Sequence, residues 1–232
     1  MATTISVSTG FSEKVLLKKS LLLCGILSSL LFVGIDILAA NQWDGYSYTG
    51  QSFSELTAIE APTRLLMIFA LSIPYNLLVI AFAAGIWASA AQKRVLRIMA
   101  ALLLAHAVAG FIGSSIFPMH SRGVEKTITL TDTLHIVSTG TEVLSMLLAI
   151  GFGAAAFGKR FRLYSIATIL ALVLGGTMAA LKGDRVAAGL PTPWMGVTER
   201  INIYAFMLWI VVLAIVLLRT SKLPGSIKGT DT

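Results

Sequence analysis

Six long runs of apolar residues alternate with polar segments along this chain of 232 residues. At about 1.5 Å per helical residue, each run is long enough to cross the hydrocarbon core of a bilayer. The pattern predicts an all-α fold, a polytopic membrane bundle of six transmembrane helices in one embedded domain, residues 1–232. Its core is expected at 19–219, with short disordered ends at 1–13 and 222–232. The predicted helices are 19–40, 63–90, 96–117, 134–157, 161–181 and 198–219.

Lysine and arginine are distributed unevenly between the two sides of these helices. One side, which includes both chain ends, carries twelve basic residues, and the other side carries six. Because basic residues accumulate on the cytoplasmic side, both termini are expected in the cytoplasm, in a multi-pass protein of the plasma or inner membrane. The twelve are Lys14, Lys18, Lys19, Lys93, Arg94, Arg97, Lys159, Arg160, Arg162, Arg219, Lys222 and Lys228; the six are Arg64, Arg122, Lys126, Lys182, Arg185 and Arg200.

Composition agrees with a membrane protein and argues against a nucleic-acid partner. The chain is 56% hydrophobic and 12% charged, with a mean hydropathy of +0.84, which is too apolar for an ordinary soluble domain. Its net charge is +7, but the basic residues form short clusters at helix ends and no stripe on a polar domain. The single cysteine, Cys24, lies in an apolar run and can form no internal disulfide.

The acidic residues point to a working surface on the outer side. Nine of the eleven lie on or just inside this side. One of them, Glu142, falls inside a predicted helix, where a carboxylate is costly and is usually kept for a function. The outer connections are also long, about seventeen to twenty-two residues each, and such loops are more often functional than idle. The nine acids are Asp36, Asp44, Glu55, Glu60, Glu125, Asp132, Glu142, Asp184 and Glu199.

The first outer loop contains a helix-start signal. Ser52 and Glu55 have the spacing of a capping box, in which each side chain accepts a hydrogen bond from the backbone amide of the other. An apolar stripe of Phe53, Leu56 and Ile59 then predicts a short helix lying in the membrane interface. Three aromatic residues before it are expected to anchor the loop at the level of the headgroups: Trp43, Tyr46 and Tyr48.

Two predicted helices carry polar residues within the membrane. Pro74 predicts a kink, and Asn76 is expected to satisfy backbone groups beside it. In the next helix His106 is expected to be neutral and hydrogen-bonded to a neighbouring helix, with a proton relay as the alternative. Gly110 and Ser114 follow at four-residue spacing and form a small-residue face that permits close helix packing.

The fourth helix has the strongest chemical pattern. His135, Ser138, Thr139 and Glu142 share one helical face, which would form a polar path from the outer surface into the bundle. Asp132 with Thr131 is interpreted as the N-cap of this helix. Upstream, His120 follows Phe117-Pro118 and brings a second imidazole near the entrance of the path.

These residues allow a metal site, although no compact motif supports one. Two histidines and a carboxylate can hold a catalytic zinc, which would activate water for hydrolysis of a lipid-like substrate. His120 and His135, with Glu55 or Asp36 as third ligand, is the easiest set geometrically. The alternative is a polar cavity without metal, in which these side chains bind one another and water. No phosphate loop, nucleophile elbow or dinucleotide fingerprint indicates a cofactor.

The third outer loop leads into the last helix through Pro193-Trp194-Met195-Gly196. Trp194 suits the membrane interface. Glu199 and Arg200 are adjacent and therefore point about 100° apart on a helix. Arg200 is expected either to pair with Glu142 or Asp36, because a buried carboxylate needs a counter-charge, or to reach a lipid phosphate.

Several short motifs, taken in order, resemble a known family. They are Ser52-Phe53-Ser54-Glu55-Leu56 with Ala61-Pro62, then Phe117-Pro118, Leu134-His135, Pro193-Trp194-x-Gly196 and Glu199-Arg200. Together they are similar to the prokaryotic six-helix membrane family known only as domain of unknown function nine-nine-eight, over roughly residues 20–220. The resemblance implies a fold class and an outer site, and no established activity. Family members typically carry an acid where this chain has His120, which either exchanges one metal ligand for another or means that no metal is bound.

Three functions are consistent with the sequence. The first is an outward-facing acidic and histidine-lined pocket that binds a small or amphipathic molecule, with membrane lipid as a further partner. The second is a membrane enzyme, such as a metal-dependent hydrolase, that acts on a lipid, isoprenoid or headgroup. The third is a proton-coupled carrier using His106 and Glu142. Candidate catalytic residues are Glu142, His135 and His120, and candidate ligand-binding residues are Asp36, Glu55, Thr139, Trp194, Glu199 and Arg200.

The charge bias makes the topology testable by labelling single cysteines in intact cells. Cysteines introduced at Ser54, Lys126 or Gly189 should react with a membrane-impermeant thiol reagent added outside, because these positions fall in the predicted outer loops. A cysteine at Gln92, in a short basic connection, should not react. Labelling at Gln92 from outside would overturn the predicted orientation.

Overall fold

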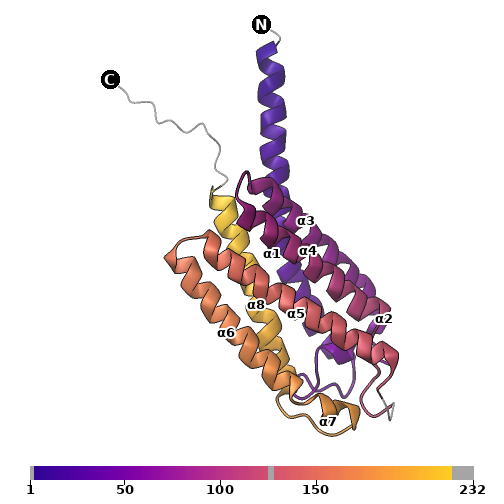
Figure 1. Cartoon of the computed structure of the whole chain (residues 1–232). Coiled ribbons are helices and arrows are strands. Elements are labelled where there is room, and N and C mark those ends of the chain that lie inside the picture. Colours follow the sequence, from indigo (N-terminus) through magenta and orange to yellow (C-terminus); the bar gives the residue numbers. More distant parts are fainter. Residues whose placement is uncertain (1–2, 125–127, 221–232) are drawn as a thin grey trace.

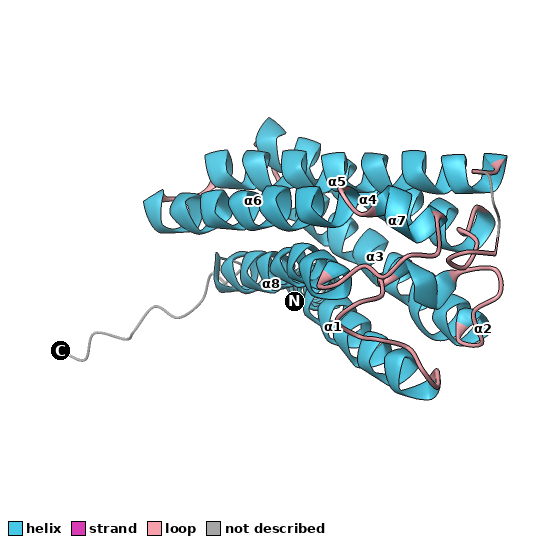
Figure 2. Ribbon diagram, turned by 90° about the horizontal axis from the view of Figure 1, so that it is seen from below, coloured by secondary structure: helices cyan, strands magenta, loops and turns pink. Residues whose placement is uncertain are grey.

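The structure is a computed structural model that describes residues 3–124 and 128–220, and within these ranges all regular structure is helical (Figures 1 and 2). By length and composition, six helices can cross a membrane, which indicates a multi-pass membrane protein. The elements are α1 (Thr3–Gln42), η1 (Ser54–Thr57), α2 (Arg64–Leu66), η2 (Met67–Ser72), α3 (Ile73–Ser89), α4 (Arg94–Phe111), η3 (Ile112–Ile116), α5 (Leu130–Ala156), α6 (Lys159–Ala180), α7 (Gly183–Ala187) and α8 (Met195–Thr220).

The six long helices form a closed ring. Each packs against two neighbours, in the order α1, α3, α4, α5, α6, α8 and back to α1. The connections 43–63 and 181–194 and the described parts of 117–129 gather at one end of the ring, at the bottom of Figure 1, whereas the short connections, the start of α1 and the end of α8 lie at the other. We call the first of these the long-loop end. Residues from the two halves of the chain therefore meet where α1 lies beside α8.

The predicted spans are confirmed, with differences at the chain ends. The structure has six membrane-length helices at the predicted places. Helix α1 already begins at Thr3, where the sequence predicts a disordered end. The predicted disordered end 222–232, with Lys222 and Lys228, lies outside the described residues, as do Glu125 and Lys126. Ser54 is partly buried, so Asp44 and Ala188, which are exposed at the long-loop end, are better labelling positions.

Small residues let large aromatic side chains fill the space between helices. Trp209 and Phe206 of α8 are fully buried and stack with ring centroids 6.2 Å apart. The Trp209 indole lies against Gly153 of α5, where a methyl group would overlap it, and its N–H donates to Ser165 Oγ of α6 at 3.0 Å. Close packing and a satisfied indole thus connect α5, α6 and α8 without a large apolar gap.

Two π-helical segments face each other near the long-loop end. η2 ends at Ser72, two positions before Pro74, and η3 directly follows the last residue of α4. Proline cannot donate to the carbonyl four residues earlier, and a wider turn accommodates this loss. As predicted, Asn76 helps to satisfy the backbone here, because its amide donates to the carbonyl of Ser72 at 2.7 Å.

The first long connection is less helical than predicted. The reciprocal bonds of the capping box are present: the amide of Ser52 donates to Glu55 Oε2 at 2.8 Å, and the amide of Glu55 donates to Ser52 Oγ at 3.3 Å. However, η1 is a four-residue 3-10 helix in which Glu55, Leu56 and Thr57 are buried. The predicted short helix is therefore present as a single 3-10 turn, and its residues Glu55, Leu56 and Thr57 pack into the protein.

Candidate functional site

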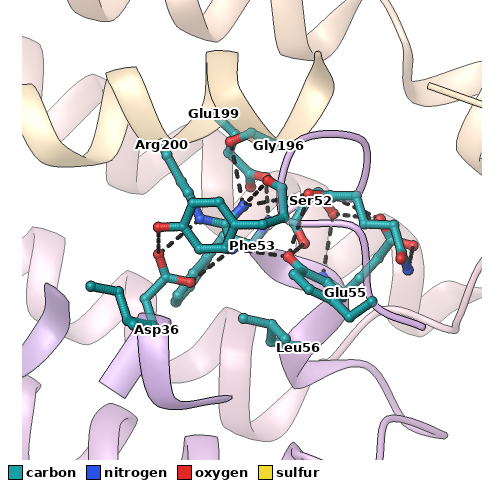
Figure 3. A network of polar contacts seen from close by, with 12 residues as sticks. Asp36, Ser52, Phe53, Glu55, Leu56, Gly196, Glu199 and Arg200 are labelled. Atoms are coloured by element: carbon teal, nitrogen blue, oxygen red, sulfur yellow. Dashed lines mark hydrogen bonds and ion pairs between the residues drawn. The ribbon is translucent and has the colours of Figure 1, made fainter. Parts of the chain in front are cut away.

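A buried ion pair joins the first and last helices at the long-loop end (Figure 3). Arg200 of α8 donates from Nε and Nη2 to the two carboxylate oxygens of Asp36 of α1, both at 2.8 Å. The exposed fractions are 3% for Arg200 and 0% for Asp36. Two parallel charge-assisted bonds of this kind fix both distance and orientation. The alternative that Arg200 reaches lipid phosphate is therefore wrong, and one of its two predicted partners, Asp36, is correct.

Three tyrosines complete the shell around this pair. Tyr204 and Tyr48 donate to Asp36 Oδ2 at 2.5 and 3.2 Å, and the guanidinium of Arg200 stacks 3.7 Å above the centroid of the Tyr48 ring. Tyr46 accepts from Arg200 Nη2 at 3.0 Å and donates to the carbonyl of Ser52 at 2.7 Å. Burial raises the pKa of the Tyr46 phenol, even though Arg200 lowers it, so the hydroxyl stays neutral.

The turn 46–51 lies directly on the start of α8. Arg200 Nη1 donates to the carbonyl of Tyr48 at 3.0 Å, and the amide of Gly196 donates to the carbonyl of Thr49 at 3.0 Å. A methyl group on Gly196 would overlap the carbonyl oxygens of Tyr48 and Gln51. Only glycine permits this close approach of two backbones.

Glu199 serves a different part of the same loop. It accepts from the amide of Phe53 at 2.6 Å and from Ser54 Oγ at 3.2 Å, at the start of η1. The two adjacent residues Glu199 and Arg200 thus hold two successive pieces of the first connection, as their separation around the helix allows.

Glu55 and Arg122 tie the three long connections together. Arg122 Nε and Nη2 donate to the carboxylate of Glu55 at 2.6 and 2.7 Å. Arg122 also donates to Thr192 Oγ1 at 3.1 Å and to the carbonyl of Leu190 at 3.3 Å. Burial alone would raise the pKa of Glu55, but the bonds from Arg122 and Ser52 outweigh it and lower the pKa. The bond to Glu55 correspondingly raises the pKa of Arg122.

Two hollows flank the turn 46–51. The larger, of about 620 Å³, opens at the long-loop end between the first and third connections, beside Arg122. The smaller, of about 450 Å³, lies along α8, and the exposed surface of both hollows is mostly apolar. The larger is lined by Ser47, Thr49, Gly50, Gln51, Arg122, Pro191, Thr192, Pro193 and Trp194, and the smaller by Tyr48, Val197, Arg200, Ile201, Tyr204, Ala205 and Leu208.

The two outer histidines lie in separate contacts. The backbone amide of His120 donates to Asp132 Oδ1 at 2.9 Å, and its ring lies 3.2 Å from the same carboxylate. His135 Nδ1 lies 2.9 Å from the carbonyl of Gly113 and 3.1 Å from that of Phe117, at the end of η3. The N-cap of α5 is Thr129, with Asp132 three residues later in a capping box, so the assignment of the cap to Asp132 and Thr131 is wrong.

The metal ligands considered from the sequence have different partners. His120 contacts Asp132, His135 contacts backbone carbonyls, Glu55 binds Arg122 and Asp36 binds Arg200. Within residues 3–124 and 128–220, no three His, Cys, Asp or Glu side chains form a group that could hold a metal ion.

Glu142 points into the ring, but not to the partners considered from the sequence. His106 Nδ1 of α4 lies 3.5 Å from Glu142 Oε1, and the carboxylate rests against Gly110. His106 Nε2 forms a 2.9 Å hydrogen bond with the hydroxyl of Tyr75 on α3, which confirms a bond to a neighbouring helix. His135, Arg200 and Asp36 each bond elsewhere. Thr139 is exposed, so it does not continue the polar path.

The family described as "Protein of unknown function (DUF998)" matches residues 26–216, most of the chain. The chain belongs to the DUF998 family. No curated protein and no solved structure matches it. In this DUF998 protein the family-like motifs meet at the long-loop end: Ser52 and Glu55 in the capping box, Gly196 under the turn 46–51, and Glu199 with Arg200 on the first connection.

The sequence reasoning missed the residues that complete these contacts. Tyr48 and Tyr204 bind Asp36, although Tyr48 was expected to be a headgroup anchor, and Arg122 joins three connections, although it was counted only as an outer basic residue. Asp36 and Glu55 could have indicated such contacts from the sequence, because a carboxylate buried at a helix end or in a loop requires a basic partner.

Removing the negative charge of Asp36 should strongly destabilise the protein. In Asp36→Asn the buried guanidinium of Arg200 keeps its charge without a counter-charge, which costs about 3–5 kcal/mol in comparable pairs. Thermal unfolding in detergent should show this as a large fall in melting temperature. Asp44→Asn, at an exposed position of the same end, should change it little; equal effects of the two substitutions would argue against the buried pair.

The Glu55–Arg122 contact should make stability depend on pH. Because the folded pKa of Glu55 lies below its ordinary value of 4.5, its contribution is present above that pH and is lost as pH falls through the lower, folded value. The difference in melting temperature between wild type and Glu55→Gln should therefore be largest near neutral pH and shrink towards about pH 3. Glu13→Gln, which removes an exposed carboxylate, should show no such narrowing. A difference that grows on acidification would contradict the prediction.

Proposed function

We propose that this DUF998 protein binds an amphipathic molecule at the outer face of the plasma or inner membrane. The long-loop end faces outside, both termini are cytoplasmic, and the hollow of about 620 Å³ takes the polar head. The observation that carries the proposal is the conformation of Trp194. Its φ is +65°, its side chain is 65% exposed, and it forms part of the wall of the hollow.

A left-handed backbone is unfavourable for a bulky residue and persists only where the surroundings impose it. Here the adjoining bonds impose it, because the amide of Gly196 is held by Thr49 and the amide of Thr198 by the carbonyl of Trp194. Such strain concentrates at binding sites. The result is a fixed backbone that carries an exposed indole beside an open hollow, an arrangement suited to stacking on a ligand.

The lining of the hollow favours a neutral head rich in hydroxyl groups. Its single cationic side chain, Arg122, is already neutralised by Glu55, so the hollow lacks a free charge for an anionic head. Ser47 and Thr49 line it with hydroxyl groups that both donate and accept hydrogen bonds, whereas the amide of Gln51 is bonded to Ser47 and Glu55. An exposed indole above such groups fits the apolar face and polar edge of a sugar.

A tail would follow α8 into the membrane. Trp194 of the larger hollow is followed on α8 by Val197, Ile201 and Leu208 of the smaller one. Val197, Ile201 and Leu208, at spacings of four and seven residues, lie on one face of α8, and Trp194 directly precedes this helix. The two hollows are also adjacent at Tyr48, which lines the smaller, between Ser47 and Thr49 of the larger.

In this proposal most of the candidate ligand-binding residues act as a scaffold. Asp36 and Arg200 hold the turn 46–51, Glu199 holds η1, and Glu55 holds Arg122, so their polar atoms are already engaged. Trp194 is the candidate that contacts the ligand. No comparable arrangement favours the hydrolase alternative, since Glu142, His135 and His120 lie in three separate contacts.

Replacing Trp194 with glycine tests the proposal without straining the fold. Glycine adopts positive φ readily, so Trp194→Gly should retain or increase thermal stability while removing the indole. Binding of a diacyl glycolipid with a neutral sugar head, measured by native mass spectrometry in detergent, should weaken at least about tenfold, or about 1.4 kcal/mol. An anionic phosphatidylglycerol with the same chains should bind more weakly than the glycolipid to the wild type.

The matched control is Trp87→Ala, at the opposite end of the ring. Trp87 is also largely exposed, at 54%, and should be replaceable without loss of glycolipid binding. If Trp194→Gly and wild type bind the glycolipid equally, the hollow does not hold the head. If both lipids bind equally well, the neutral head assigned here is wrong.

A further inference from the structure

A carboxylate and an imidazole meet inside the ring without a fixed cation. Glu142 lies twelve residues after the start of α5, about 18 Å along the helix from the long-loop end. No lysine or arginine forms an ion pair with it among the described residues. Arg200 is not available, because all three of its nitrogens have other partners. A lasting negative charge at this depth would be expensive.

The imidazole beside it is more fully enclosed than the Glu142 side chain, which is 26% exposed. His106 is fully buried, and Phe206 packs edge-to-face against its ring, with centroids 4.8 Å apart. Its Nε2 is engaged by Tyr75, but Nδ1, which faces Glu142, forms no hydrogen bond of normal length within the part of the chain that is described. The two groups at 3.5 Å are thus each other's acid–base partners.

A column of three hydroxyl groups lies between this pair and the long-loop end. Ser114 Oγ lies 2.9 Å from Ser72 Oγ, which lies 2.8 Å from Ser115 Oγ. Ser114 also donates to the carbonyl of Gly110, the residue on which the carboxylate of Glu142 rests. Hydroxyl groups both donate and accept, so the three serines can pass a proton among themselves. Among the described residues Ser114 forms no direct hydrogen bond with Glu142, so transfer between these two requires their side chains to approach each other.

The column lies where the helices depart from regular geometry. Ser72 ends η2, and Ser114 and Ser115 belong to η3, the two π-helical segments that face each other. Irregular backbone at membrane depth is tolerated where it is buried or lines a polar path, and π-bulges occur frequently at functional sites. The carboxamide oxygen of Asn76, buried beside Ser72, adds an acceptor without a hydrogen-bond partner among the described residues.

We propose that Glu142 and His106 form an intramembrane site that binds one proton, which is exchanged with the long-loop side through the hydroxyl groups of Ser72, Ser114 and Ser115. In the loaded state Glu142 is a neutral acid beside a neutral imidazole. On release, the proton leaves the carboxyl group along the hydroxyl column, and the carboxylate then accepts the Nδ1–H of His106. One proton moves, and no other covalent bond changes.

The surrounding groups favour a proton over a metal ion. Four titratable side chains from four helices face the site: Tyr75 on α3, His106 on α4, Glu142 on α5 and Glu199 on α8, which interacts electrostatically with Glu142. Glu199 is already bound by Phe53 and Ser54, and within residues 3–124 and 128–220 His106 and Glu142 lack the third His, Cys, Asp or Glu ligand that would complete a metal site. The proposal is independent of the amphipathic ligand, because none of these side chains lines either hollow.

Infrared difference spectroscopy of the full-length protein in lipid vesicles would test this site directly. Between about pH 4 and about pH 10, the wild type should show the carbonyl stretch of a protonated carboxylic acid that disappears as pH rises and shifts in D2O. Glu142→Gln should lack this band and take up roughly one proton fewer per chain over the same range. Glu60→Gln, which removes an exposed carboxylate, should keep the band.

Two further variants separate a proton site from a structural contact. His106→Gln should retain the band but move its midpoint, whereas Ser72→Ala with Ser114→Ala should slow its appearance after a pH jump and leave the midpoint unchanged. A band that persists in Glu142→Gln, or a wild type without one, would overturn the proposal. So would a midpoint that depends on sodium concentration. The wild-type spectra decide the matter even if a variant fails to fold.

Discussion

The long-loop end of this DUF998 protein depends on the contact between Asp36 and Arg200. Both side chains are almost fully buried and form two parallel hydrogen bonds. If either moved away, the other would remain as a buried charge without a partner. The pair closes the helix ring, because it joins α1 to α8. Arg200 also holds the turn 46–51 against Gly196, and the adjacent Glu199 points towards the first connection.

The charged side chains at this end bind one another more than they face outward. Glu55 and Arg122 hold the three connections in the same way that Asp36 and Arg200 hold the helices. Of the acidic residues predicted on the outer side, Asp36, Glu55 and Glu199 therefore form internal contacts in the folded chain, whereas Asp44, Glu60 and Asp184 are exposed. What these contacts leave open is a hollow with the exposed indole of Trp194 in its wall.

The membrane-embedded polar groups form a second, separate system. His106, Glu142 and the serines of the π-helical segments lie between α3, α4 and α5, away from the Asp36–Arg200 pair. Buried polar groups without full hydrogen bonding are costly in hydrocarbon, where water does not compensate them. These polar groups lie beside the π-helical segments η2 and η3. Glu142, which can gain or lose a proton, is therefore close to backbone of irregular geometry.

The sequence alone determined the class of the fold, the places of the six spans and the capping box of Ser52 and Glu55, because these depend on hydropathy and on residues close along the chain. Which charges pair was decided by the order of the helices in the ring. Since α8 lies beside α1, Arg200 meets Asp36, and since α4 lies beside α5, Glu142 meets His106 instead of Arg200. Local sequence carries no signal for such neighbours, because their contact is set by packing between helices far apart along the chain.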